Sequence, residues 1–159
     1  MTDTPAKDAK LVQYLNEANA KEKELEAALA AHIAMSEMAE RKPYKKKLQE
    51  HLRETKSHSK QLERSIKKLG GPGSVTESAV ATVAKTAGNL RGQAVSAAKG
   101  PLHMVRGTSP EEKLLKNAKT EYWNEAEEIA TYSAIETLAD SVGDRETAQL
   151  ARAIKREEE

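Results

Sequence analysis

The spacing of apolar residues is the feature that most restricts how this chain can fold. Apolar or small side chains recur at intervals of three and four in the first segment, once position 22 is included: Leu11, Leu15, Ala18, Leu25 and Leu29. This pattern predicts one face of a long helix over about residues 8–40. The composition agrees, because the 159 residues are 38% hydrophobic but only 3% aromatic, with no Phe. A core of small and aliphatic side chains on helices is typical of an all-α fold.

Short breaks divide the remaining sequence into further helices. The Arg-Lys-Pro sequence at 41–43 precedes a second periodic run, which stops at the Gly-Gly-Pro-Gly sequence at 70–73. Two long helices joined so closely must run antiparallel. The Ser-Pro-Glu-Glu sequence at 109–112 then opens a third long helix, because it combines an N-cap serine, a first-turn proline and a Glu three residues after the cap.

A crossover connection and a last helix complete the predicted fold. Residues 74–108 are rich in Ala and Val but interrupted by glycines, so we expect a crossover that carries an extra short helix. The third helix is predicted to reach about Ser141, where Gly143 stops it, and Asp144 caps a helix that runs to the end. The length supports one domain over residues 1–159, built as an antiparallel four-helix bundle.

The charge balance and the absence of cysteine exclude several classes of function. The chain has 26 Lys or Arg and 25 Asp or Glu, which argues against a protein that coats nucleic acid or an anionic membrane. Without Cys, any chemistry must use oxygen or imidazole groups. There is no apolar run of membrane-spanning length and no signal-peptide stretch, so we expect a soluble, cytoplasmic protein without a membrane partner.

Acidic residues interrupt the apolar stripes of the long helices. One glutamate lies on the first stripe, two lie on the third, and one lies at the end of the fourth. On the second helix a glutamate and a histidine share one side, and His51 lies one turn before that glutamate. A carboxylate that faces a bundle core costs several kcal/mol unless a cation or a donor meets it. The candidate metal ligands are Glu22, Glu54, His58, Glu125, Glu128 and Glu158.

Carboxylates that converge from four helices repel one another, whereas hard divalent cations require such ligands. Oxygen ligands with imidazole suit iron, manganese or zinc, and two metals about 3.5 to 4 Å apart are typical of carboxylate sites in bundle cores. For any single glutamate, a place at the edge of the stripe in contact with water is the simpler interpretation. Tyr132 lies one turn beyond Glu128; its hydroxyl would bond a ligand or, as is more usual for Tyr, reach the bundle surface.

Three stretches resemble a known family in their order and spacing. They are residues 14–29 (YLNEANAKEKELEAAL), 51–63 (HLRETKSHSKQLE) and 125–143 (EAEEIATYSAIETLADSVG), followed by the terminal IKREEE. Over about two thirds of its length the chain is similar to the YciE/YciF-type ferritin-like proteins. The resemblance implies a ferritin-like four-helix bundle, a link to stress responses, a dinuclear metal centre and a homodimer. It places the ligands at the same positions: Glu22, Glu54 with His58 beside it, Glu125, Glu128 and Glu158.

The chain departs from the ferritin pattern at two points. Ferritin-type sites use Glu-x-x-His on two helices, and this sequence contains no such motif. Its nearest equivalents are Glu54-x-x-x-His58 and His51-x-x-Glu54. The family's fourth helix also continues for several turns, whereas this chain stops just after Glu158. Either the chain is truncated, or its last helix is short and its site more open.

Three functions are compatible with these features. Two ferrous ions held by carboxylates would favour the ferric state and leave positions for oxygen or peroxide, which predicts ferroxidase or peroxide-consuming chemistry. A metal-free helical interaction or scaffold protein is the alternative, because residues 41–70 carry 11 basic and 3 acidic side chains whereas residues 111–159 carry 7 and 13. A DNA-associated stress protein is less favoured, since the charge is balanced and only Tyr44 is available for stacking. Its contacts would be Arg41, Lys42, Lys45, Lys46 and Lys47.

Three further side chains have expected places. His32 lies one turn beyond Leu29, and we expect it at the surface, as is usual for a single His. Tyr122 and Trp123 precede Glu125 on the third helix, and we expect them to pack in the core or against a second subunit.

Overall fold

Four helices form the described part of the molecule. The structure is a computed structural model that describes residues 6–35, 40–71 and 109–159. Within these ranges there are no strands, so the predicted all-α bundle is confirmed. The predicted crossover helix within residues 74–108 lies outside the described residues. The helices are α1 (Ala6–Ile33), α2 (Lys42–Lys68), α5 (Pro110–Val142) and α6 (Arg145–Glu158).

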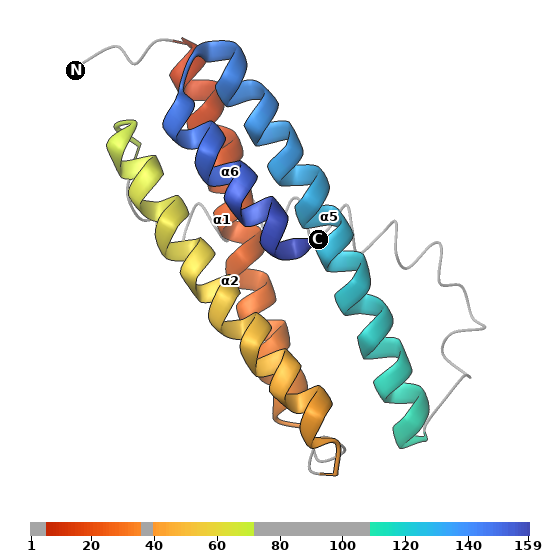
Figure 1. Ribbon diagram of the computed structural model, residues 1–159. Coiled ribbons are helices and arrows are strands. Elements are labelled where there is room, and N and C mark those ends of the chain that lie inside the picture. The colour runs from red at the N-terminus through yellow and green to blue at the C-terminus, as the bar shows by residue number, and fades with distance from the viewer. Residues whose placement is uncertain (1–5, 36–39, 72–108) are drawn as a thin grey trace, which may run out of the picture.

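The helices pack as two antiparallel pairs. α1 lies beside α2 and α5 beside α6, while α1 also contacts α5 and α2 contacts α6 (Figure 1). α2 ends at the end of the bundle opposite to the start of α5 (Figure 1). No helix among the described residues is both long and apolar enough to cross a membrane.

Local signals fix the ends of α5 and α6 as the sequence predicts. Ser109 is the N-cap of α5, and its side chain accepts a hydrogen bond from the backbone N–H of Glu112. Gly143 ends α5 with a φ of 82°, in the left-handed region that favours glycine. The carboxylate of Asp144 then accepts a hydrogen bond from the backbone N–H of Thr147 and caps α6.

The end of α1 differs from the prediction. The helix stops at Ile33 rather than near residue 40, and Tyr44 of α2 packs on His32. The two rings meet edge to face with centroids 5.6 Å apart. The expectation that His32 lies at the surface is wrong: it is 4% exposed, and its Nδ1 lies 3.2 Å from Glu121 Oε1.

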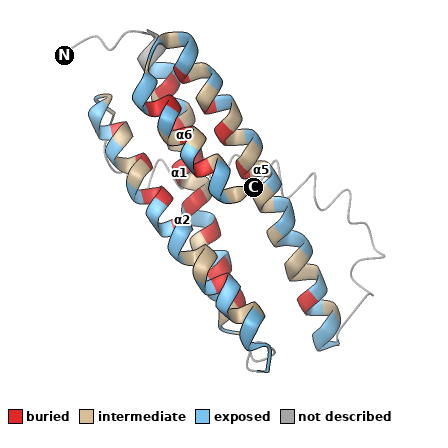
Figure 2. Cartoon of the chain, in the orientation of Figure 1, coloured by how far each residue is buried: buried red, intermediate tan, exposed pale blue. Residues whose placement is uncertain are grey.

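Two apolar clusters fill the bundle at different heights. All four helices contribute to the first, the four-helix core, whose members are 0–2% exposed. Only α1, α2 and α5 contribute to the second, the three-helix core, which consists of Leu25, Leu29, Leu48 and Leu114. The buried residues of α5 gather mainly along its half beside α6 (Figure 2). The four-helix core contains Leu11, Leu15, Ala18, Leu62, Ile66, Tyr132, Ile135, Ala139, Ala148, Ala151 and Ile154.

The unequal lengths of the last two helices explain this division. α5 has 33 residues and α6 has 14, which at 1.5 Å per residue corresponds to about 50 and 21 Å. α6 therefore covers only part of α5, and the first turns of α5 face α2 without a fourth helix between them (Figure 1).

The two aromatic residues in the middle of α5 point outward. Tyr122 is 76% exposed and Trp123 is 68% exposed. The expectation that Tyr122 and Trp123 pack in the core of this chain is therefore wrong, and their contact with a second subunit stays a prediction.

Candidate metal centre

A layer of buried polar side chains lies between the two cores. Glu22 of α1 and Glu128 of α5 are each 1% exposed, and His58 of α2 is fully buried. The side chain of Glu158, in the last turn of α6, is 4% exposed. Each helix thus contributes one ionisable group, because each group occupies a position of its helix's inward stripe.

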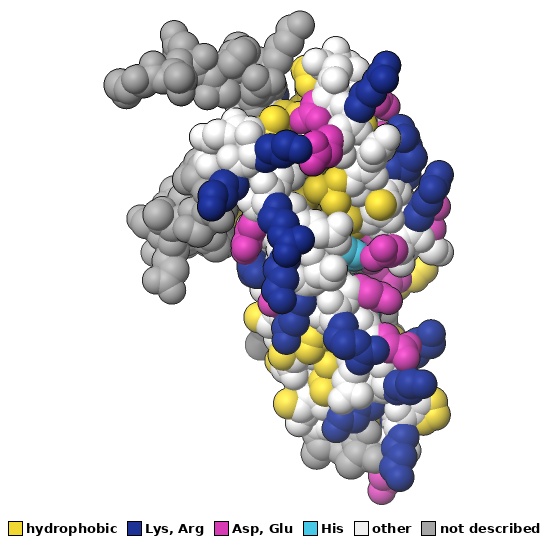
Figure 3. Space-filling view, turned by 60° about the vertical axis from the view of Figure 1, so that its left-hand side comes forward, with side chains coloured by type: hydrophobic (Ala, Val, Ile, Leu, Met, Phe, Trp, Pro, Cys, Tyr) yellow, Lys and Arg dark blue, Asp and Glu magenta, His cyan; other side chains and the backbone are white. Residues whose placement is uncertain are grey.

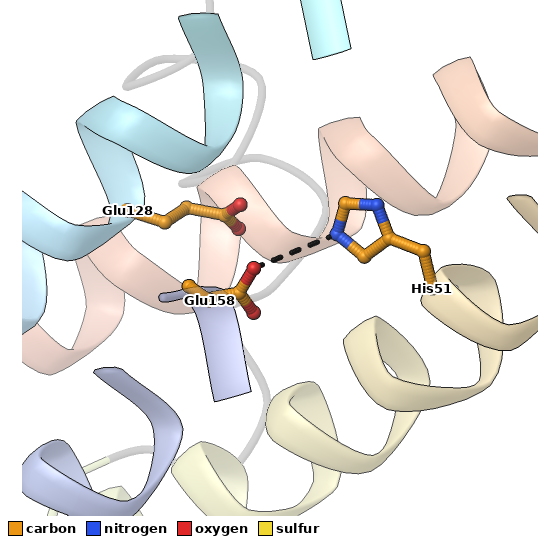
Figure 4. A group of neighbouring side chains, drawn as sticks. All are labelled: His51, Glu128 and Glu158. Carbon is orange, nitrogen blue, oxygen red and sulfur yellow. Dashed lines mark ion pairs between the residues drawn. The ribbon is translucent and has the colours of Figure 1, made fainter. Parts of the chain in front are cut away.

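The carboxylate of Glu158 lies at the middle of this layer. Its Oε1 is 3.2 Å from Nδ1 of His58, and its Oε2 is 3.6 Å from Nε2 of His51. Figure 4 shows His51, Glu128 and Glu158 pointing toward one another from α2, α5 and α6. One ligand atom from each of the three lies within 4.8 Å of the others, a spacing that suits a shared cation.

The contact of His58 Nε2 determines which ring nitrogen faces the other carboxylates of the layer. Nε2 lies 2.8 Å from Glu157 Oε2, so its N–H donates to that carboxylate and leaves Nδ1 toward Glu22 and Glu158. A carboxylate behind a histidine in this way is the usual support of a metal-bound imidazole. Burial alone would lower the pKa of His58, but its interactions with the carboxylates of Glu158, Glu22 and Glu157 raise it to about 11.

Glu128 is the least satisfied group of the layer. Among the described residues neither of its carboxylate oxygens has a hydrogen-bond partner, although both are buried. Burial, followed by the charges of Glu22 and Glu158, raises the pKa of Glu128 to about 9. Without a cation this group is therefore held neutral at pH 7, whereas a cation between the carboxylates would permit the charged form.

Tyr132 supports the layer from the side of the four-helix core. It is 1% exposed, and its hydroxyl donates a hydrogen bond to Glu22 Oε1. The expectation that this hydroxyl reaches the bundle surface is wrong, and the alternative, a bond to a candidate ligand, is what the structure shows. Burial and the nearby charge of Glu22 raise the pKa of Tyr132, so the phenol stays protonated and keeps donating.

The remaining predicted residues lie at the edge of the layer or outside it. Glu125 has a 39% exposed side chain and lies 3.8 Å from His51 Nδ1. Burial is the main reason that the pKa of Glu125 is raised. Glu54 is exposed and is not brought into the buried group; the α2 residue that forms a potential metal-binding group with Glu128 and Glu158 is His51 instead. The sequence feature that could have indicated His51 as a candidate ligand is its spacing of seven residues from His58, which places both on one face of α2, two helical turns apart.

Comparison with known proteins identifies the family. Residues 6–159 match a family described as a domain of unknown function, DUF892. The chain belongs to the DUF892 family. The crystal structure of a protein from Xanthomonas campestris pv. campestris is similar to this DUF892 protein, with a TM-score of 0.67 and 24% identity. The match covers 96% of this chain and 82% of that chain, and at this identity it supports the fold alone. No curated protein matches the sequence.

A groove leads from the surface of this DUF892 protein to the polar layer. It lies between the first half of α2 and residues 118–125 of α5, next to the last turn of α6, and has a volume of about 480 Å³. Its inner wall includes His51 and Glu158, which also belong to the candidate centre. The other acidic side chains of its wall are Glu50, Glu54, Glu121, Glu125, Glu157 and Glu159.

Proposed function

We propose that this DUF892 protein binds two divalent metal ions in the buried polar layer of its bundle. The observation that carries the proposal is the carboxylate of Glu128, which is 1% exposed, lacks a hydrogen-bond partner among the described residues and lies near two other buried carboxylates. An uncompensated group of this kind costs several kcal/mol in a bundle core. Cations between the carboxylates would remove that cost.

The two oxygens of Glu158 indicate two metal positions rather than one. Because each oxygen faces a different histidine of α2, an inner position is bounded by His58 and Glu22, and an outer position by His51 and Glu125. Glu128 approaches Glu158 from the facing helix and would be shared between the two positions. A carboxylate between two metals is the usual arrangement of dinuclear sites in helical bundles.

The ligand chemistry favours iron or manganese, with zinc also suited. Carboxylates and imidazole are the ligands that these ions accept, and bound iron would supply oxidation by oxygen or peroxide. In this scheme Tyr132 holds Glu22 in place and Glu157 holds His58 in place, so both groups position ligands. We infer a ferritin-like, stress-associated protein with ferroxidase or peroxide-consuming activity, related to the YciE/YciF type and acting as a cytoplasmic homodimer.

Metal content tests this proposal. Protein stripped with a chelator would be loaded with Fe²⁺ without oxygen or with Mn²⁺, freed of unbound metal and measured by mass spectrometry. We expect close to two metals per chain in the natural protein and fewer in Glu22→Ala and Glu128→Gln. Glu136→Gln is the matched control, because Glu136 lies on α5 but pairs with Arg152 and Lys155 outside the layer. Absence of bound metal, or equal loading of all variants, would contradict the proposal.

The outer face of α2 supports a second candidate function, the binding of a nucleic acid. Figure 3 shows Lys and Arg side chains in a long row on this face of the molecule. Exposed basic side chains recur along α2 at intervals of three, four or seven residues. At 1.5 Å per residue they form a basic stripe about 38 Å long. Its members are Lys42, Lys46, Arg53, Lys56, Lys60, Arg64 and Lys67.

Salt-dependent binding to a short DNA duplex tests the second candidate. Contacts between phosphates and several Lys or Arg side chains weaken steeply as salt increases. We expect retention at low salt that falls with added salt, and a smaller salt slope in Arg53→Gln/Lys60→Gln than in the control Lys10→Gln/Lys119→Gln. Lack of retention at low salt would remove this candidate and leave the metal proposal untouched.

A further inference from the structure

A second apolar face of α5 lies outside the bundle. α5 packs mainly against α6 and α1, which lie on one side of it (Figure 1). Among the described residues three large apolar side chains are exposed, and all three belong to α5: Leu115, Tyr122 and Trp123. Exposed aromatic side chains that gather on one surface are typical of protein interfaces.

This face continues along α5 as a stripe without charge. Its positions follow one another at steps of three and four, the spacing of a helix face that packs on another helix, and all of them are exposed or half-buried. A solvated helix face ordinarily carries charged side chains, and 32% of this chain is charged. The uncharged face therefore favours burial in an assembly. We call it the outer stripe of α5; its members are Tyr122, Ala126, Ile129, Ser133 and Thr137, with Trp123 and Ala130 beside them.

The polar atoms of the outer stripe are already used within α5. Ser133 Oγ donates a hydrogen bond of 2.7 Å to the carbonyl oxygen of Ile129, and Thr137 Oγ1 donates one of 2.9 Å to the carbonyl oxygen of Ser133. Burial of these side chains would therefore leave neither hydroxyl without a partner. The small side chains of Ala126, Ala130 and Ser133 would also let a second helix approach to about 8 Å between the axes.

Opposite charges stand at the two ends of the outer stripe. Lys119 precedes it and Asp140 follows it, and both are exposed. Asp140 lies 3.4 Å from Arg152 of its own chain, but its side chain is still 55% exposed. In an antiparallel pair of α5 helices with a two-fold axis between Ile129 and Ala130, Lys119 of each copy faces Asp140 of the other, because both are equally far from the axis. A parallel pair would instead bring like charges together.

We propose that the outer stripe of α5 binds the same stripe of a second copy of this chain, antiparallel about a two-fold axis between positions 129 and 130. The inference rests on the homodimer of the proposed function and does not depend on bound metal. The small side chains lie at the axis, where the helices are closest. Ala126 faces Ser133 of the other copy and Tyr122 faces Thr137, so the aromatic rings close the ends of the contact. Tyr and Trp in such places carry much of the binding energy, and the end charges set the register.

Engineered cysteines test the register, because the chain has no Cys of its own. Ala130→Cys lies about 1.5 Å along the helices from its copy, so mild oxidation should link it to itself. Ala126→Cys lies about 10 Å along the helices from its copy, too far for a disulfide, but it faces Ser133→Cys. Neither of these two variants should cross-link alone, and an equilibrated mixture of both should. Ala28→Cys, exposed on α1, is the control and should stay uncoupled.

Sedimentation equilibrium measures the association itself. The natural protein should be a dimer, and Ala130→Arg should weaken the dimer by at least about 100-fold, because it places two like charges beside the axis. Ala28→Arg is the matched control and should stay dimeric. Lys119→Asp should weaken the dimer by a smaller factor, since exposed ion pairs contribute little, and Lys119→Asp/Asp140→Lys should restore it.

The outcomes separate this interface from the metal proposal. A monomeric natural protein would overturn the interface, and protection of Trp123, the one tryptophan of the chain, from acrylamide quenching in that monomer would assign the outer stripe to another segment of the chain. A dimer that Ala130→Arg leaves intact, or self-linking of Ala126→Cys, would overturn the register. Metal loading of Ala130→Arg should equal that of the natural protein. Absence of metal from both would contradict the metal proposal and leave the interface standing.

Discussion

The two halves of the bundle differ in how far the residues of α5 are buried. Between residues 128 and 139 its inward positions are buried against three other helices, whereas between 115 and 127 none of its residues is buried. The last turn of α6 lies beside Glu128, and the first half of α5 lacks that helix as a neighbour. The polar layer lies at this boundary, closed by apolar side chains on one side and open to an acidic groove on the other.

Core truncations should separate the two halves most clearly. Ile135 is fully buried in the four-helix core, and Ile135→Ala is expected to lower the free energy of unfolding by about 2–5 kcal/mol. Leu114 of the three-helix core is 7% exposed, so Leu114→Ala should fall at or below the lower end of that range. Urea unfolding of both variants measures the difference. Equal losses would mean that the two halves are packed alike.

The pH dependence of the metal-free protein should show the cost of the buried layer. The pKa of Glu128 is about 9 in the folded state, above its ordinary value of 4.5. The folded protein therefore binds more protons than the unfolded chain between these values, and the contribution of Glu128 to stability is lost as pH rises through this window. The raised pKa of His58, about 11, acts in the same direction above pH 6.5.

Glu128→Gln isolates this contribution. The variant carries no titrating group at position 128, so its stability relative to the natural protein should increase as pH rises from 5 to 9, by at most about 1.4 kcal/mol per pH unit. Urea midpoints in the presence of a chelator measure it, with Glu136→Gln as control. A difference between Glu128→Gln and the natural protein that does not change with pH would contradict a buried, neutral Glu128.

Tyr132 links the closed half to the polar layer. Removing its hydroxyl in Tyr132→Phe deprives Glu22 of a hydrogen bond, which is worth about 1.5–3 kcal/mol for a charged acceptor. Metal affinity should also fall by about 10- to 100-fold, as for other groups that orient ligands. Competition with a coloured chelator measures the affinity, and Tyr122→Phe at the exposed face is the control. Natural affinity in Tyr132→Phe would show that Glu22 does not depend on this bond.

Removal of a helix cap should give the smallest losses of stability, and these losses should still differ between the two halves of the bundle. Asp144→Ala removes the cap of α6 within the four-helix half and should cost about 1–2 kcal/mol. Ser109→Ala removes the cap of α5 at its free end, where fraying should limit the cost to about 0.5 kcal/mol. Hydrogen exchange would locate the loss: around the start of α6 in the first variant, and within the first turn of α5 in the second. Global loss in Ser109→Ala would contradict a loosely held end.

Local sequence signals predicted the parts of the structure that depend on one helix at a time. The caps at Ser109 and Asp144 and the inward positions of Glu22 and Glu128 follow from spacing along a single helix. The burial of His32 and the hydroxyl bond of Tyr132 did not follow, because they depend on partners 89 and 110 residues away.

The position of His51 and the presence of the groove also depend on contacts between helices that are far apart in the sequence. Whether His51 or Glu54 faces the layer depends on the rotation of α2 against α6, which periodicity fixes only to about one residue. The groove depends on where α6 ends relative to α2 and α5, and no single segment carries that information.

Anomalous diffraction from crystals soaked in Mn²⁺ tests the central claim most directly. The account predicts two peaks within the bundle, one beside Glu22 and His58 and one beside His51, on either side of the Glu158 carboxylate. Peaks confined to exposed carboxylates, with none in the layer, would contradict it.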